Sequence, residues 1–254
     1  MTKFSANLGF LWSDRSLPDA IRAAKAAGFD AVECHFPYET PAAEVNQALH
    51  HTGLKMLGLN TAPGDASSGD NGLAALPDRV DEARKAIDQA ISYAADIGAR
   101  NIHVLAGKAT GPDAHNTYVA NLRYAADQAA AHDQIILIEP LNKYAAPGYF
   151  LTTTSQACDI LAEIGADNIK LMFDCYHVQL MEGDLSNKFK HLLPVIGHVQ
   201  FASVPDRGEP DKGEVNFRHM FKHIESLGYS APLGAEYKPK GDTDATLGWM
   251  KTLV

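Results

Sequence analysis

Cysteine is scarce in this chain of 254 residues, which contains only Cys34, Cys158 and Cys175. An odd number of cysteines without CxxC spacing excludes a disulfide framework and a cysteine-based metal site. The absence of structural disulfides is typical of proteins from a reducing compartment. We therefore expect a cytoplasmic protein in which Cys175 contributes to packing.

Basic residues are also few, because 22 lysines and arginines face 31 aspartates and glutamates, which gives a formal net charge of −9. Nucleic-acid-binding proteins generally present a basic face, and binding to anionic lipid requires clustered Lys and Arg. The chain lacks the roughly 18 consecutive apolar residues of a membrane span, and its start, MTKFSANLGF, does not resemble a secretory signal. We expect neither nucleic-acid nor membrane partners. An anionic small molecule would require a local cluster of positive side chains.

The dinucleotide-binding fingerprint GxGxxG and the phosphate-binding loop GxxxxGK[ST] are both absent. The sequence contains instead a repeated pattern, in which an alanine-rich helical segment is followed by a glycine and a short apolar run. The pattern surrounds Gly28, Gly53, Gly98, Gly165 and Gly228. A glycine directly after a helix supplies the left-handed residue that ends it. Helices that alternate with short apolar strands indicate a parallel sheet covered by helices.

Eight strand–helix units are predicted. The strands fall at 4–8, 30–33, 55–59, 102–105, 135–139, 170–174, 197–201 and 233–236, and the helices at 17–27, 41–52, 80–97, 117–132, 155–164, 184–193, 217–227 and 244–253. This arrangement predicts a single α/β domain, a (β/α)8 TIM barrel over residues 1–254, because such barrels typically have about 250 residues. The alternative, a doubly wound open sheet, usually has fewer strands. Long polar loops at 61–72 and 203–214 follow the third and seventh strands, where barrel enzymes place their chemistry.

Four late strands end in oxygen-bearing side chains, namely Glu139, Asp174, Gln200 and Glu236. Because the carboxyl ends of neighbouring barrel strands converge on one mouth, we expect these side chains to meet. Three carboxylates in one apolar pocket repel one another, and a divalent cation removes that conflict. Carboxylate and amide oxygens suit Mg2+ or Mn2+. His198, two residues before Gln200 on the same strand face, is a rival ligand that is expected to lie deeper in the barrel.

Further candidates surround this predicted metal site. His177, three residues after Asp174, and Arg207, in the loop after the seventh strand, are predicted to bind an anionic substrate. Lys108 and His103, at or just after the fourth strand, are additional substrate-binding candidates. Glu33 ends the second strand, where it either lines the pocket or pairs with a cation at the barrel floor, and we interpret it as structural.

Several segments resemble the hydroxypyruvate isomerase family of xylose isomerase-like TIM barrels. They include LIEPLN (137–142), FDCYHVQLMEGDL (173–185), HVQFASVPDRGEPDKGEVNF (198–217) and GAEYKP (234–239), and the resemblance covers essentially the whole chain. It implies a (β/α)8 barrel that catalyses aldose–ketose type isomerisation, with Glu139 and Glu236 as the catalytic pair. It also implies a metal bound by Glu139, Asp174, Gln200 and Glu236. Related ketose epimerases have a histidine where Gln200 stands.

Two subgroups of that family compete. NTAPGD (60–65) and GLAALP (72–77) resemble the 2-oxo-tetronate isomerases, whereas PGYFLTT (147–153) and YHVQLMEGDL (176–185) resemble hydroxypyruvate isomerase proper. The expected reaction interconverts hydroxypyruvate and 2-hydroxy-3-oxopropanoate (tartronate semialdehyde) through an enediolate. The alternatives are a 2-oxo-tetronate isomerase, a sugar-acid epimerase and a metabolite-binding barrel without turnover. A nuclease would need more histidines and a basic face. A homo-oligomer is compatible with the sequence.

Overall fold

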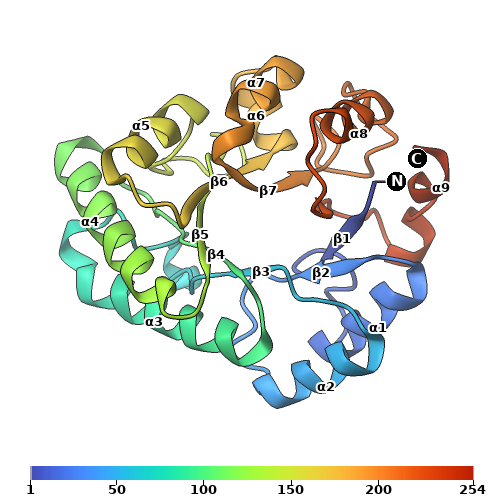
Figure 1. The fold of residues 1–254 in the computed structure, drawn as a ribbon, viewed down its shortest axis with the longest axis horizontal. Helices are drawn as coiled ribbons and strands as arrows, with labels where there is room; N and C mark the ends of the chain where they lie inside the picture. Colours follow the sequence, from blue (N-terminus) through green and yellow to red (C-terminus); the bar gives the residue numbers. More distant parts are fainter. Residues whose placement is uncertain (1, 254) are drawn as a thin grey trace.

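Eight short parallel strands form one sheet at the centre of the computed structural model, which describes residues 2–253 (Figure 1). Each strand pairs in parallel along the order β2-β1-β8-β7-β6-β5-β4-β3. The strands are β1 (Phe4–Asn7), β2 (Ala31–Glu33), β3 (Gly58–Asn60), β4 (Asn101–His103), β5 (Ile135–Ile138), β6 (Ile169–Asp174), β7 (Ile196–Phe201) and β8 (Leu233–Ala235). The first strand therefore lies beside the last.

The edge between β2 and β3 closes through individual backbone hydrogen bonds. The N–H of Val32 donates to the carbonyl of Lys55 over 3.0 Å, and the N–H of Leu57 donates back to Val32 over 2.7 Å. With this closure, the sheet forms the barrel predicted from the sequence. Closure leaves no long exposed edge, which is the usual weakness of an open sheet.

Helices surround the strands on the outside (Figure 1). They are α1 (Leu17–Ala27), α2 (Ala42–Thr52), α3 (Val80–Ile97), α4 (Gly111–Ala130), α5 (Thr154–Ile164), α6 (Cys175–Met181), α7 (Leu185–Leu192), α8 (Phe217–Ser226) and α9 (Trp249–Thr252). Short 3-10 turns occupy η1 (Ala66–Ser68), η2 (Pro77–Arg79), η3 (Leu193–Val195) and η4 (Thr243–Thr246). No helix in residues 2–253 has the length and apolarity needed to cross a bilayer.

The alternation of helix and strand follows from local sequence signals. Helix α1 begins at Ser16, whose hydroxyl accepts the N–H of Asp19, and it has Pro18 in its first turn. It ends at Gly28, which has a φ of 93° in the left-handed region. A side chain in that conformation would be strained, whereas glycine adopts it freely. The chain then reverses directly into β2.

Three predicted elements differ from the structure by more than two residues or are divided. Strand β3 covers Gly58–Asn60 rather than 55–59, because the residues before Gly58 bond only singly to β2. Helix α4 begins at Gly111, six positions before the predicted 117, with a proline in its first turn. Proline fits there because a first-turn N–H has no partner inside the helix. The predicted helix 244–253 is divided into η4 and α9, which Gly248 separates.

Helix α6 was not predicted. It begins directly after β6, and the side chain of Asp174 caps it by accepting the N–H of Tyr176 over 2.8 Å. A carboxylate at a helix N-terminus satisfies one of the free N–H groups there. Asp174 therefore ends a strand and begins a helix at the same time, which fixes the carboxylate at the mouth of the barrel.

Candidate functional site

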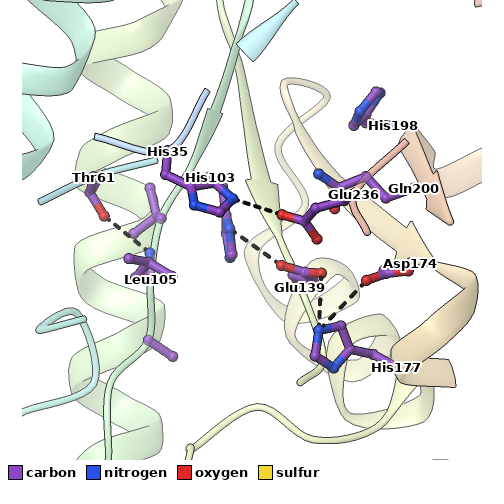
Figure 2. A network of polar contacts seen from close by, with 12 residues as sticks. His35, Thr61, His103, Leu105, Glu139, Asp174, His177, His198, Gln200 and Glu236 are labelled. Carbon is purple, nitrogen blue, oxygen red and sulfur yellow. Dashed lines mark hydrogen bonds and ion pairs between the residues drawn. The ribbon is translucent and has the colours of Figure 1, made fainter. Parts of the chain in front are cut away.

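The polar ends of strands β5, β6 and β8 meet at the mouth of the barrel (Figure 2). Glu139 directly follows β5, Asp174 is the last residue of β6, and Glu236 directly follows β8. A cavity of about 220 Å³ adjoins Glu139 and Glu236, and its walls also include His177 and Arg207. Because all strands are parallel, their carboxyl ends share one face, and Glu139, Asp174 and Glu236 lie there. Gln200, predicted to join them, lines a smaller cavity with Glu33 and His198.

The three buried carboxyl groups have different pKa values, because their charged neighbours differ. Burial, together with the neighbouring Glu236 and Asp174 charges, raises the pKa of Glu139 well above its usual range. Burial also raises the pKa of Asp174 to about 7, although Arg207 opposes this shift. Burial would raise the pKa of Glu236 as well, but Arg207 and a hydrogen bond from His35 overcome it and lower that pKa to about 2. One glutamate therefore retains a proton where the other is a carboxylate.

Three donors converge on the carboxylate of Glu236. Arg207 Nη2 lies 2.5 Å from its Oε2, while His35 Nε2 and Asn7 Nδ2 lie 2.9 and 3.0 Å from its Oε1. His35 and Asn7 were not among the residues predicted from the sequence. The signal was present, because Asn7 ends the first strand and His35 follows the second by two residues.

Arg207 lies between two aromatic rings. Its guanidinium carbon is 4.9 Å from the ring centre of Phe10 and 5.0 Å from that of Tyr176. A guanidinium over an aromatic face is attracted by the ring quadrupole, more strongly where water is excluded. Arg207 also approaches Asp174 to within 3.7 Å. The residue predicted to bind an anion thus lies at the pocket, where it already neutralises two carboxyl groups.

His177 is held in one tautomer. Its Nδ1 accepts the backbone N–H of Asn142 over 2.9 Å, and a backbone amide can only donate. Burial lowers the pKa of His177 far below its usual range, so the ring is neutral and carries its proton on Nε2. That Nε2 lies 3.6 Å from Asp174 Oδ2 and 4.0 Å from Glu139 Oε1, without a hydrogen-bond partner. The imidazole therefore presents a donor to the space between the two carboxyl groups (Figure 2).

The same group of side chains can hold a metal ion. Ligand atoms of Glu139, Asp174 and His177 all lie within 4.8 Å of one another, and all three residues are buried. Three buried oxygens, Glu139 Oε1, Asp174 Oδ2 and Gln200 Oε1, have no hydrogen-bond partner. Buried polar atoms are normally paired, so these oxygens fit a hard divalent cation. His177 is the weaker ligand, because the nitrogen that faces the cluster carries a proton.

Of the remaining predicted residues, one lines the pocket and two lie outside it. His103 lines the pocket, with its Nδ1 3.4 Å from Glu139 Oε2, and burial lowers its pKa to about 4. Lys108 is not brought to the pocket, because its ammonium group donates to the carbonyl of Gly69 over 2.6 Å. His198 lies deeper in the barrel and pairs with Glu33 over 2.5 Å.

Gly9 makes room for the ring of His35. A Cβ at this position would lie only 2.1 Å from His35 Nδ1. We therefore expect Gly9→Ala to displace the imidazole from Glu236, to lower kcat, and to destabilise the protein by about 1–3 kcal/mol, as overpacking does. Chemical unfolding together with steady-state kinetics measures both effects. Gly248→Ala is the matched control, because nothing lies within 4 Å of its Cβ. Equal behaviour of the two variants would contradict the role of His35.

Comparison with known proteins gives a consistent picture. The family model described as xylose isomerase-like TIM barrel matches residues 21–253. The chain is 45% identical to the 2-oxo-tetronate isomerase of Cupriavidus necator, over 99% of this chain and 98% of the relative. It is 39% identical to the hydroxypyruvate isomerase of Escherichia coli, over 98% of each.

Among solved structures, the barrel superposes on the crystal structure of an AP endonuclease, family 2, from Brucella melitensis. The TM-score is 0.95 at 36% identity, with 99% of both chains covered. Sequence similarity and backbone similarity thus extend over nearly the full chain. The chain belongs to the hydroxypyruvate isomerase and 2-oxo-tetronate isomerase family of xylose isomerase-like TIM barrels, and it is an isomerase.

Proposed function

We propose that this isomerase interconverts hydroxypyruvate and 2-hydroxy-3-oxopropanoate by proton transfer through an enediolate. The observation that carries the proposal is that Glu139 and Glu236 line one cavity with pKa values shifted in opposite directions. Two carboxyl groups whose environments separate their pKa values are the usual acid and base of such reactions. One glutamate removes the proton from the hydroxymethyl carbon, and the other delivers a proton to the carbon beside the carboxylate. The hydroxyl proton passes from the oxygen of the first carbon to the oxygen of the second.

The substrate would be held by donors that line the cavity. Arg207 already pairs with Glu236 and Asp174, but its Nε–H has no hydrogen-bond partner and would donate to the substrate carboxylate. The Nε2–H of His177 would donate to a substrate oxygen between Glu139 and Asp174, and His103 lies at the same wall. Neutral imidazole is a suitable donor, since it polarises an oxygen without adding a charge to be neutralised.

We propose Mg2+ or Mn2+ as the cofactor, bound by oxygens of Glu139, Asp174, Gln200 and Glu236. Three of these residues contribute the unpaired buried oxygens described above. A bound ion would stabilise negative charge on the vicinal substrate oxygens, a Lewis-acid contribution of several kcal/mol. Of the four proposed ligands, Glu236 has the fewest lone pairs available for an ion, because its oxygens already accept hydrogen bonds from three donors.

A 2-oxo-tetronate is the second candidate substrate. The relative from Cupriavidus necator that carries this name is 45% identical to the chain. Asn60 and Asn71 also line the cavity, and their amides could bind the additional hydroxyl of a four-carbon acid.

A nuclease activity is not proposed, because the net charge of −9 does not support binding to a DNA backbone.

A panel of small acids tests this proposal. The protein should turn over hydroxypyruvate, 2-oxo-tetronate or both, and the larger kcat/KM identifies the preferred acid. Chelator should abolish turnover, and Mg2+ or Mn2+ should restore it. Faster turnover of neutral ketoses would favour an epimerase, and no turnover of any compound would favour a binding protein. Full activity after chelation would remove the metal from the mechanism and leave the two glutamates in place.

A further inference from the structure

A second polar layer lies below the carboxyl cluster, inside the barrel. It consists of Asn7, Glu33, His198 and Gln200, whose exposed fractions are 1%, 4%, 4% and 4%. A small cavity of about 20 Å³ adjoins all four residues. Asn7 also donates to Glu236 and Gln200 is a proposed metal ligand, whereas Glu33 and His198 have no role in the proposed reaction. Polar groups buried to this extent require a specific arrangement of partners.

Glu33 is the acceptor at the centre of this layer. His198 Nε2 lies 2.5 Å from its Oε2, and Gln200 Nε2 and Asn7 Nδ2 lie 3.1 and 3.3 Å from its Oε1. The amide of Asn7 is oriented independently, because its Oδ1 accepts the backbone N–H of Gly9 over 2.9 Å. Asn7 must therefore present its NH2 group to the carboxyl groups, where it also reaches Glu236.

The hydrogen bond between Gln200 and Glu33 sets the orientation of the Gln200 amide. Since Glu33 receives the NH2 group of Gln200, the carbonyl oxygen of that amide is turned away from Glu33, and it has no partner. Leaving a buried acceptor unpaired costs about 1–3 kcal/mol. Gln200 stands in register with Asp174 on the neighbouring strand, so the two side chains lie side by side. The amide of Gln200 therefore lies beside Asp174, and its unpaired oxygen is the atom that is not turned toward Glu33.

We propose that Glu33 is a positioning residue that orients the amide of Gln200, so that its carbonyl oxygen and not its NH2 group serves as a ligand for the divalent cation. The inference rests on the proposed metal-assisted function. An unrestrained amide would have two orientations, and one of them would place two N–H donors toward the cation. Groups that orient a metal ligand typically change metal affinity or activity 10–100-fold when they are removed.

Gly234 on β8 provides the space for this arrangement. A Cβ at Gly234 would lie 2.4 Å from Glu33 Oε1 and 2.8 Å from Gln200 Cγ. Strand β8 lies between β7 and β1, and it has no side chain at the point where Glu33 and Gln200 meet. Gly234→Ala would separate the pair without removing a polar group from it.

The competing explanation is that Glu33 only forms a structural pair with His198. A double-mutant cycle distinguishes this explanation from the positioning role. Mn2+ is the probe, and its affinity for each variant is measured by electron paramagnetic resonance. Glu33→Met should weaken Mn2+ binding about 10–100-fold. In a Gln200→Ala background, the same change should have no further effect, because the ligand that Glu33 orients is already absent. A purely structural role predicts additive losses.

Glu182→Met is the matched control. Glu182 is a half-buried carboxylate that bonds Thr154 and Lys188, away from the cluster, so its loss should affect stability but not Mn2+ affinity. Should Glu33→Met fail to fold, Gly234→Ala must show the same loss of affinity. Unchanged Mn2+ affinity, additive losses or no Mn2+ binding by the native protein would each overturn the proposal. Turnover is measured separately, so a metal-binding protein without isomerase activity would refute only the proposed reaction.

Discussion

Replacement of Glu139 by glutamine should abolish turnover while making the protein more resistant to unfolding. The loss of activity follows from the loss of one of two proton-transferring groups, which typically contribute 10²–10⁴-fold each. The gain in stability follows from the raised pKa of Glu139, which shows that its charged form is disfavoured in the folded protein. Wild-type Glu139 must take up a proton when the chain folds, whereas an amide of the same shape is neutral in both states and avoids that cost.

The sign of the pH effect follows from linkage. A carboxyl group with a raised pKa in the folded protein binds its proton more tightly there than in the unfolded chain, so stability falls as pH rises above the unfolded value. The stabilising effect of Glu139→Gln should therefore be larger at pH 8 than at pH 5, measured by thermal unfolding in chelator. Glu163→Gln, at an exposed ion pair with His115, is the control. Retained turnover in Glu139→Gln would remove Glu139 from the chemistry.

Arg207→Ala should produce the second large loss of catalytic activity. The guanidinium neutralises Glu236 and Asp174, and in the proposed complex it also pairs with the substrate carboxylate. Removal of one partner from a buried, hydrogen-bonded charge pair across a binding interface costs about 2–5 kcal/mol. That range corresponds to roughly 30- to 5,000-fold in kcat/KM. We expect both a higher KM, because the substrate carboxylate loses its partner, and a lower kcat, because the pKa of Glu236 is no longer held near 2.

Two further measurements sharpen this prediction. Arg207→Lys should not restore activity, because an ammonium group cannot reproduce the planar stack between Phe10 and Tyr176. Added guanidinium ion should partly rescue Arg207→Ala and leave Glu139→Gln inactive. Wild-type activity in Arg207→Lys, or equal rescue of both variants, would show that Arg207 acts only as a diffuse positive charge.

The site residues on β5 to β8 were predictable because the sequence pattern that indicates them is local. Glu139, Asp174 and Glu236 each end or directly follow an apolar strand, and parallel strands place such residues on one face. The early half was not predictable in the same way. Asn7 and His35 reach Glu236 only because β1 pairs with β8 and so closes the barrel, which is a contact across more than two hundred residues.

Loop conformation accounts for the other differences. Lys108 follows β4 closely, but its side chain turns to the carbonyl of Gly69 in a neighbouring loop, which no local pattern encodes. Arg207 was predicted to bind an anion, and the structure places it on carboxylates of the chain itself. Charge balance among residues far apart in sequence determines that choice. Glu33 was interpreted as structural, and its contact with Gln200 was not predicted, because that contact depends on the empty position at Gly234.

The central claim, proton transfer between two glutamates, is tested most directly by isomerisation of hydroxypyruvate in D2O. Because one carboxyl group removes the proton and a different one delivers it, the delivered hydrogen should come from a site that has exchanged with solvent. Nuclear magnetic resonance at early times should then show deuterium on the carbon beside the carboxylate of the product. A product that carries only the hydrogen of the substrate at that carbon would indicate a hydride shift or transfer by a single shielded base, and either would contradict proton transfer between two glutamates.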